Sequence, residues 1–377
     1  MRTKLKICFF GTYDKTYTSN KLILQGLRAN GVSVLEINAH TKVTRLDKKD
    51  EMNWLNLLGR AVKKVRLFTE VARNFSEFKK VDAIYVGYPG HLDVLLAYPL
   101  AKLFGKKLVF NPLLIFYTGF VEEQGILDKD SLLAKIIKFG ETTVYNSCDL
   151  VLADTPFQEE YLKRDFRVNP AKLKVLPIGA DDVYYAYTPY VNKSKKIRVV
   201  YYGLYSPIHG VKYLVEAARF LRKEKDIEFV MVGNGNTFQK NYDNAKKLKL
   251  TNIKFYHDTP EDQHVAILQT ADIFPGFFQK HPTVDRVIPN KVYQGMALGK
   301  VVLTADAPVI RSAFVNKETI YTVKPADAGS IARAILELKN DPALRYSIAQ
   351  NSYKLYKKKF TSKAVGKELK RYIEKII

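Results

Sequence analysis

Residues 289–304 are the part of this sequence whose residue types point most directly to chemistry. The segment reads as a helix that begins at Pro289, ends at Gly299 and leads into a β-branched strand. A helix that starts at the mouth of a strand presents unpaired backbone N–H groups and a positive dipole end to an anion. Lys291 lies in this first turn, where a cation is unfavourable unless an anion shares the site. The segment therefore predicts an anion-binding site, and a solvated surface lysine is the equally weighted alternative.

Elements able to position such a site recur along the chain, because strand-like runs alternate with helical stretches. Several of these runs are continuously apolar, as expected for parallel strands covered on both faces. The expected strands are residues 6–10, 33–38, 83–86, 107–110, 150–153, 174–177, 198–202, 228–232, 254–256, 273–275, 301–304 and 319–322. The alternation predicts an α/β protein with two doubly wound, Rossmann-like domains and a ligand-binding cleft between them.

A polar, tyrosine-rich break at residues 181–196 divides the expected strands into two series. The length of 377 residues also exceeds what one hydrophobic core usually supports. We therefore expect a first domain at residues 1–180, a linker at 181–196 and a second domain at 197–355. The basic, amphipathic segment 356–377 forms a last helix.

The formal charge of +23 implies an anionic partner, such as nucleic acid, an acidic membrane or a phosphorylated ligand. A solvated, lysine-rich surface is the simpler alternative. No nucleic-acid-binding module is recognisable, so the sequence predicts no specific nucleic-acid partner. Cys8 and Cys148 are the two cysteines, which argues against a disulfide framework and fits a reducing cytoplasm. The start of the chain resembles a strand rather than a secretion signal, and no apolar run reaches the length of a membrane span.

Residues 42–80 form a basic segment with eleven Lys and Arg against five Asp and Glu. Apolar residues recur at helical spacing within it, beginning at Trp54. One interpretation is a helix or helix pair on an anionic bilayer, with membrane-surface residues Trp54, Arg60, Lys63 and Lys64. The equally weighted alternative is an ordinary helix that packs on the sheet and solvates its basic face.

Three segments carry a resemblance to a known family. Residues 201–210 (YYGLYSPIHG) and 229–235 (FVMVGNG) each read as a strand followed by a glycine turn, and the 289–304 helix start follows at a matching distance. Together they resemble the donor-binding domain of GT-B glycosyltransferases, family 4. The glycine turn at residues 10–14 fits the same family, so the resemblance covers the whole chain and is most specific in the C-terminal half.

The resemblance implies a GT-B fold and transfer of a sugar from a nucleotide-sugar donor. It implies retention of configuration and no metal or other cofactor. The first domain would bind the acceptor, a glycan or a polyprenyl-linked glycan, and the second the nucleotide sugar. The last helix would return to the first domain. The protein would then work in the cytoplasm, with peripheral attachment to the cytoplasmic face of the membrane as an extension.

Donor-binding residues are expected mainly in the second domain. They are Gly11, Gly203, His209, Gly233, Asn234, Arg286, Asn290, Lys291 and Gln294. The sequence departs from the family at four of its key positions: the two diphosphate-binding cations fall on Leu204 and His209, and the two glutamates fall on Arg286 and Gln294. Arg286, Lys291 and His209 could rebuild a positive phosphate site, and the Gln294 amide could bind a ribose hydroxyl. The alternative is a catalytically inactive, partner-binding copy.

His91 and Asn111 are the candidate catalytic residues on the acceptor side. His91 follows an expected strand end and could assist proton transfer from an acceptor hydroxyl, although a structural loop histidine is an equal alternative. Asn111 follows the strand at 107–110, where the family commonly has a histidine or an aspartate. Its amide can bind a hydroxyl but cannot act as a base. Asp128 and Asp130 have a metal-binding spacing, but this pair fits a helix start better, so no metal site is predicted.

Overall fold

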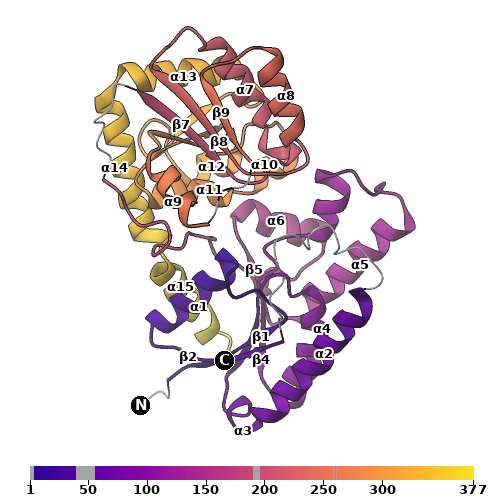
Figure 1. The fold of residues 1–377 in the computed structure, drawn as a ribbon. Coiled ribbons are helices and arrows are strands. Elements are labelled where there is room, and N and C mark those ends of the chain that lie inside the picture. The colour runs from indigo at the N-terminus through magenta and orange to yellow at the C-terminus, as the bar shows by residue number, and fades with distance from the viewer. Residues whose placement is uncertain (1–3, 40–55, 190–195, 258, 260) are drawn as a thin grey trace. The chain divides into compact units, whose positions relative to one another are not determined.

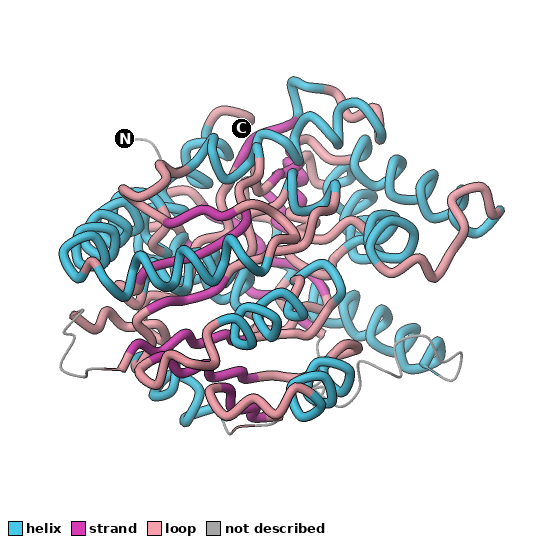
Figure 2. Tube along the Cα trace, turned by 90° about the horizontal axis from the view of Figure 1, so that it is seen from above, coloured by secondary structure: helices cyan, strands magenta, loops and turns pink. Residues whose placement is uncertain are grey.

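The computed structural model describes residues 4–39, 56–189, 196–257, 259 and 261–377. The chain divides into two compact units, of which the first comprises Met1–Pro177 with Ser362–Ile377 and the second comprises Ile178–Thr361. Each unit is a parallel β-sheet with helices on both faces (Figure 1). Strands and helices alternate along both units (Figure 2).

The sheet of the first unit has the strand order β2-β1-β3-β4-β5-β6, and all neighbours are parallel. Its strands are β1 (Lys6–Gly11), β2 (Ser33–Asn38), β3 (Ala83–Val86), β4 (Lys107–Phe110), β5 (Leu150–Ala153) and β6 (Leu173–Val175). Its helices are α1 (Thr18–Ala29), α2 (Asn56–Arg73), α3 (Phe75–Phe78), α4 (His91–Leu103), η2 (Thr118–Glu123), α5 (Leu132–Ser147), α6 (Pro156–Asp165), η3 (Pro170–Lys172) and α15 (Ser362–Glu374). Separate hydrophobic cores fill its two faces, one beneath α2, α4, α5 and α6 and the other beneath α1 and α15.

Helix α15 belongs to the first unit although it follows the whole second unit in sequence. It packs against α1 so closely that a Cβ atom on Gly366 would lie 2.1 Å from the backbone carbon of Gly26. The Asn30 side chain donates to the Lys363 carbonyl oxygen at 2.8 Å, and the Tyr372 hydroxyl donates to the Val175 carbonyl oxygen at 2.9 Å. The last helix thus completes one face of the first sheet.

The sheet of the second unit has the order β12-β11-β10-β7-β8-β9, again with all neighbours parallel. Its strands are β7 (Ile197–Tyr202), β8 (Ile227–Val232), β9 (Ile253–Tyr256), β10 (Ile273–Pro275), β11 (Val301–Ala305) and β12 (Tyr321–Val323). Its helices are η4 (Pro207–His209), α7 (Val211–Phe220), α8 (Phe238–Lys247), α9 (Glu261–Gln269), α10 (Pro282–Arg286), α11 (Asn290–Ala297), α12 (Pro308–Ala313), α13 (Ala328–Asn340) and α14 (Pro342–Lys359). Strand order reverses its sequence direction between β7 and β10, which is a topological switch point.

The predicted α/β class with two doubly wound sheets is confirmed, and each expected strand overlaps an observed one. The helix expected after Pro289 is also present as α11. Pro289 is its N-cap residue, with ψ of 142°, so the helix proper begins one residue later than the sequence suggested. Gly299 follows the helix with φ of 70°, a conformation that glycine adopts without strain.

The basic segment at residues 42–80 is described only in part. Trp54 lies outside the described residues, and the side chains of Arg60, Lys63 and Lys64 on α2 are likewise not described. The visible part of α2 and α3 buries Leu67, among other apolar side chains, against the sheet. Across the described chain, no helix combines the length and the apolar character that crossing a membrane requires.

Candidate functional site

The switch point of the second sheet brings together residues from three segments. Gly203 follows β7 with φ of 132°, Phe277 follows β10, and Lys291 lies in the first turn of α11. The Lys291 Nζ atom lies 4.2 Å from the ring centroid of Tyr201, the penultimate residue of β7, and 5.4 Å from that of Phe277. Open α/β sheets bind their ligands at the carboxyl ends of the strands beside such a switch point.

His209 completes this cluster from the short helix η4. Its Nδ1 atom lies 3.3 Å from Lys291 Nζ and 2.9 Å from the Tyr201 hydroxyl oxygen. The His209 ring stacks on Phe277 with 4.4 Å between centroids. The Tyr201 hydroxyl also lies 2.7 Å from the Leu204 carbonyl oxygen, to which it donates. Two side chains that are cationic when protonated are therefore held against each other.

The electrostatics of the cluster favour its uncharged form. Lys291 is 6% exposed, and burial lowers its pKa to about 7. Burial, followed by the neighbouring Lys291 charge, holds the pKa of His209 well below its usual range. Within the described part of the chain, no carboxylate forms an ion pair with Lys291. An anion reaching this cluster would favour the protonated form of both side chains.

Two glycine turns leave the backbone open beside Lys291. A Cβ atom on Gly203 would lie 3.3 Å from Lys291 Nζ, and one on Gly233 would lie 2.1 Å from the Gly203 carbonyl oxygen. Gly233 has φ of 131°, so both turns depend on glycine. Asn234 is exposed in the second turn, and its side-chain oxygen accepts the Gly235 N–H at 2.6 Å.

The structure thus brings four of the predicted donor residues into contact, namely Gly203, His209, Gly233 and Lys291. Asn290 opens α11, where first-turn N–H groups lack partners within the helix. Gln294 lies three residues after Lys291 on the same side of α11 and is buried. Arg286 ends α10 and is partly buried.

His91 belongs to the first unit and is the first residue of α4. It is buried between the rings of Phe110 and Phe116. Its Nε2 atom lies 3.2 Å from a Glu141 carboxylate oxygen and 3.3 Å from the Tyr145 hydroxyl. The carboxylate selects the tautomer that carries its proton on Nε2. The Nδ1 atom is buried and has no hydrogen-bond partner among the described residues.

Asn111 and Gly11 also lie at the carboxyl edge of the first sheet. Asn111 follows β4, and its side chain hydrogen-bonds the Tyr85 hydroxyl. Gly11 ends β1 with φ of 140°, and a Cβ atom there would lie 2.6 Å from an oxygen of Asp93. The same Asp93 oxygen accepts the Thr12 N–H at 2.8 Å. In the first unit, Gly11 therefore lets the chain approach a buried carboxylate.

Sequence reasoning missed Asp154, the residue directly after β5 and thus next to the end of β4. Its Oδ1 atom is buried without a hydrogen-bond partner in the described structure. Burial raises the pKa of its carboxyl to about 7, against the lowering effect of backbone hydrogen bonds. A carboxyl group with this pKa at the carboxyl edge of a parallel sheet is a functional candidate. The sequence feature that could have identified Asp154 is an aspartate immediately after an apolar strand.

Asp154→Asn is expected to stabilise the protein at pH 8 and to have little effect at pH 4. Folding raises the pKa of Asp154, so its protonated form stabilises the native state fully below pH 4 and loses this effect as pH rises through about 7. The neutral amide of asparagine avoids the cost of a buried, ionised carboxylate, so the free energy of unfolding should rise by about 1–3 kcal/mol at pH 8. Urea unfolding at both pH values measures the difference. An equal change at pH 4 and pH 8 would contradict the titration of Asp154.

Tyr201 and Phe277 are the other residues that sequence reasoning did not single out as site residues. Both rings line the Lys291 amine, where they exclude water and supply a cation–π contact to its protonated form. Aromatic residues at or just after a strand end are also common in ordinary cores. Their position in the sequence therefore carried no specific signal.

Comparisons with known proteins agree with this architecture. Residues 189–355 match the family model described as Glycosyl transferases group 1. The solved structure of HepE from Anabaena in complex with UDP is 14% identical, with a TM-score of 0.68 over 99% of this chain and 100% of that chain. Sucrose-phosphate synthase from Thermosynechococcus elongatus is 15% identical, with a TM-score of 0.74 over 99% of both chains. No curated protein sequence matches this chain.

A third similar structure is the lipopolysaccharide outer core galactosyltransferase WaaB. It is 13% identical, with a TM-score of 0.60 over 99% of this chain and 100% of that chain. At such identities the likeness to solved structures shows the fold alone, and the match to the family model adds the family. This chain therefore has the GT-B fold, and its residues 189–355 form a domain of the glycosyl transferases group 1 family.

Proposed function

We propose that this chain transfers a glycosyl group from a nucleotide sugar to a glycan or a polyprenyl-linked acceptor. The observation that carries the proposal is Lys291, which is buried beside His209 at the switch point and has no carboxylate partner among the described residues. An unpaired buried lysine lowers stability unless a ligand uses it. The similar HepE structures contain UDP and UDP-glucose. The negatively charged diphosphate of such a ligand would pair with the protonated Lys291 and His209 side chains.

The proposed chemistry follows from where charge develops. Cleavage of the sugar–phosphate bond leaves negative charge on the departing diphosphate and positive charge on the sugar ring. The Lys291 ammonium and the first N–H groups of α11 would stabilise the diphosphate. The open backbone at Gly203 and Gly233 would allow its oxygens to approach closely. His209 would donate a hydrogen bond once the anion favours its protonation.

The remaining donor residues have narrower proposed roles. The Gln294 amide would bind a ribose hydroxyl, and Arg286 would contact the sugar or its phosphate. Asn290 and Asn234 would add polar contacts at the rim. Retention of configuration and independence from metal ions remain part of the proposal, and both rest on the resemblance to the family. On the acceptor side, His91 is proposed to bind or deprotonate the acceptor hydroxyl, and Asn111 is proposed to bind it.

The proposal extends to location. We propose a cytoplasmic protein that attaches peripherally to the cytoplasmic face of a membrane, where a polyprenyl-linked acceptor would be available. The charge of +23 supports attraction to an anionic surface.

A thermal-shift panel of nucleoside diphosphates and their sugars, with EDTA present, tests the donor site. A ligand that binds the native state raises the free energy of unfolding, by about 2.7 kcal/mol at one hundred times its Kd, and therefore raises the melting temperature. We expect a clear shift with one nucleobase. Turnover of that donor with a panel of glycan acceptors, followed by NMR of the product's anomeric proton, then tests transfer and retention.

The competing function is a catalytically inactive copy that binds a partner protein or glycan. What favours it is that Arg286 and Gln294 stand where the resemblance to the family leads us to expect two glutamates. No thermal shift at millimolar nucleotide, with or without added divalent metal, would favour this second function and contradict the first.

A further inference from the structure

Helix α5 presents an apolar stripe to solvent. Leu132 and Phe139 are each 74% exposed, and Ile136 lies between them on the same side of the helix and is also exposed. Successive residues of an α-helix are 100° apart, so these three and Thr143 lie within about 60° of one another. A surface helix normally turns polar residues to water and apolar residues to the core. The buried side of α5 carries Ala134, Val144 and Tyr145, together with the carboxylate of Glu141.

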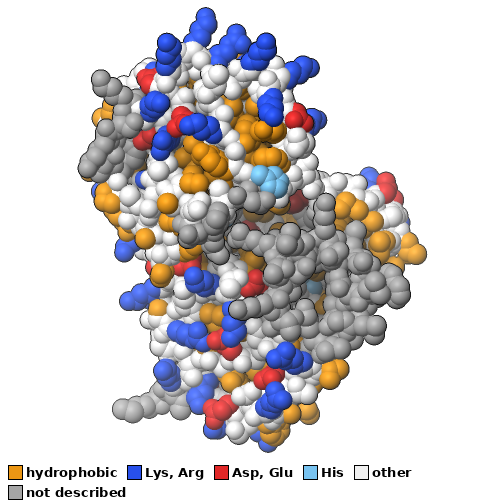
Figure 3. All heavy atoms as spheres, viewed as in Figure 1, with side chains coloured by type: hydrophobic (Ala, Val, Ile, Leu, Met, Phe, Trp, Pro, Cys, Tyr) orange, Lys and Arg blue, Asp and Glu red, His pale blue; other side chains and the backbone are white. Residues whose placement is uncertain are grey.

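Helix α4 repeats the pattern beside α5. Leu92, Leu95 and Leu103 are exposed at a spacing that puts them on one side, and Leu103 is 76% exposed. The two helices pack against each other, so their exposed stripes form one surface. In Figure 3 hydrophobic side chains gather at the right-hand edge of the molecule, where Figure 1 places α5. We call this surface, formed by the exposed side chains of α4 and α5, the α4–α5 face.

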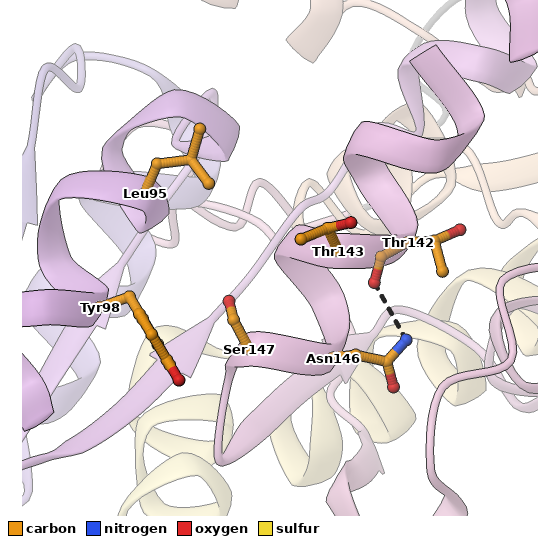
Figure 4. A pocket seen from close by; sticks show the side chains of 6 residues that line it. All are labelled: Leu95, Tyr98, Thr142, Thr143, Asn146 and Ser147. Carbon is orange, nitrogen blue, oxygen red and sulfur yellow. Dashed lines mark hydrogen bonds between the residues drawn. The ribbon is translucent and has the colours of Figure 1, made fainter. Parts of the chain in front are cut away.

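A groove of about 500 Å³ lies within the α4–α5 face (Figure 4). Leu95 and Tyr98 of α4 form one wall, and Thr142, Thr143, Asn146 and Ser147 of α5 form the other. Each of these four polar side chains donates to a carbonyl oxygen of its own helix, three or four residues earlier. Their hydrogen-bonding donors are therefore satisfied locally, which lowers the cost of covering the groove with an apolar partner.

The exposed charges of helices α4 and α5 themselves have one sign, and the exposed Asp128 and Asp130 lie in the turn before α5, at the opposite end of that helix from Thr143. The two carboxylates of these helices, Asp93 and Glu141, are buried, whereas Lys102 and Lys135 are exposed. The Lys102 ammonium lies 5.5 Å from the Tyr98 ring, with its alkyl stem along the apolar surface. An apolar stripe with lysines at its border, and with no exposed carboxylate on either described helix, complements an anionic lipid surface.

We propose that the α4–α5 face docks onto an anionic lipid bilayer. Leucine, isoleucine and phenylalanine side chains enter the interface, and Lys102 and Lys135 remain at the level of the phosphate groups. This inference deepens the proposed function, on which it rests for its biological purpose, by naming the surface that meets the membrane. A second copy of the chain fits less well, because it would bring two lysine-bordered surfaces of the same charge together.

The position of α4 connects this face to the acceptor side of the first unit. His91 opens α4 at the carboxyl edge of the sheet, and the next residue, Leu92, is already exposed on the α4–α5 face. A bilayer held by Leu92 would therefore lie one residue from the edge that carries His91.

Co-sedimentation with vesicles tests the proposal on the full chain. We expect binding to vesicles of phosphatidylglycerol and phosphatidylcholine, weak binding to phosphatidylcholine alone, and loss of binding at high salt. The double variant Ile136→Glu/Phe139→Glu should lower the partition coefficient at least tenfold. Both side chains are exposed, so the fold should be retained, which circular dichroism checks. Lys102→Glu/Lys135→Glu is a second route to the same loss if the first variant fails to fold.

Matched controls lie on the second unit, where Phe220 is also an exposed aromatic residue on a helix and Lys223 is an exposed lysine. Phe220→Glu and Lys223→Glu should bind vesicles as the unchanged protein does. Equal loss in the controls, or full binding by the double variant, would overturn the proposal. So would a dimer, detected by sedimentation velocity without lipid, that Ile136→Glu/Phe139→Glu dissociates.

Thermal shift with nucleoside diphosphates on the same samples separates this inference from the proposed function. Vesicle binding without any nucleotide shift would contradict the transferase function and support the α4–α5 face. A nucleotide shift that persists in a protein unable to bind anionic vesicles would contradict the face alone.

Discussion

Lys291→Met is expected to stabilise the ligand-free protein and to abolish its stabilisation by nucleoside diphosphates. Lysine in the unfolded chain is protonated below pH 10.5, whereas burial holds the pKa of Lys291 at about 7 in the folded state. Each pKa unit corresponds to about 1.4 kcal/mol, so the lysine costs about 3–5 kcal/mol of stability near pH 7. Methionine has a similar length and no charge, and it removes this cost.

The pH dependence gives the sign of the effect. Because folding lowers the pKa of Lys291, its contribution to stability is most favourable above pH 10.5 and declines as pH falls towards 7. The stability gain from Lys291→Met should therefore be large at pH 7 and small at pH 10. Thermal or urea unfolding at both pH values measures it. An anion bound at Lys291 raises this pKa again, so nucleotide binding near pH 7.5 should also take up a proton, which calorimetry in two buffers detects.

Lys300→Met is the matched control. Lys300 is also buried, and burial lowers its pKa, but its Nζ atom donates to the Gln269 carbonyl oxygen at 2.6 Å. Its replacement should leave the nucleotide shift intact and should not stabilise the protein, because it removes a hydrogen bond. If Lys291→Met keeps the nucleotide shift, the diphosphate role of Lys291 is wrong. If Lys291→Met lowers the melting temperature, the ammonium is stabilised in the free protein and no anion is needed to explain it.

Glu141→Ala is expected to destabilise the first unit by about 3–5 kcal/mol. The Glu141 carboxylate is buried and accepts the N–H groups of Phe116 and Tyr117 at 2.7 and 2.9 Å and the Tyr145 hydroxyl at 2.9 Å. His91 makes the fourth contact. Alanine would leave two backbone N–H groups and a hydroxyl buried without an acceptor, and each costs about 1–3 kcal/mol.

Urea unfolding followed by the loss of secondary structure measures this change. Glu77→Ala is a suitable control in the same unit, because Glu77 is exposed and pairs with Lys80 in a surface ion pair. It should leave the urea midpoint unchanged within the error of the measurement. A loss of under 1 kcal/mol in Glu141→Ala would mean that water replaces the carboxylate, so the cluster around His91 would be open to solvent.

The strands of this fold could be predicted because strands buried on both faces consist of consecutive apolar residues. Short continuous apolar runs such as Ala83–Val86 and Leu150–Ala153 are typical of strands covered on both faces, and the structure has both at the predicted positions. Pro289 and Gly299 marked the limits of α11 for equally local reasons, since both act through their own backbone angles. The role of residues that act through their own backbone geometry can be predicted from the sequence alone.

The contacts of Lys291 with Tyr201 and His209 could not be predicted, because they join residues far apart in sequence. Lys291 and His209 are 82 positions apart, and only the reversal of strand order between β7 and β10 brings them within 3.3 Å. The pairing of His91 with Glu141 across 50 positions is hidden for the same reason. The sequence did single out Lys291, but from its conflict with the helix dipole rather than from its surroundings.

The exposed face of α4 and α5 was missed for a different reason. Leu132, Ile136 and Phe139 share α5 with apolar residues that are buried, such as Ala134 and Val144, so polarity does not distinguish the solvent side of the helix from its core side. Periodicity is informative only when the two faces differ. The basic segment at residues 42–80 attracted attention because its faces do differ, and its role at a membrane stays a prediction.

The return of α15 to the first unit has a consequence for the order of synthesis. The ribosome makes residues 362–377 only after the whole of Ile178–Thr361. While the second unit is synthesised and can fold, the face of the first sheet that later receives α15 is therefore open to water. Apolar side chains such as Leu369 and Ile373 fill that face last. During translation the first unit is thus the less complete of the two, and it is the one that depends on shielding from other chains until the final helix arrives.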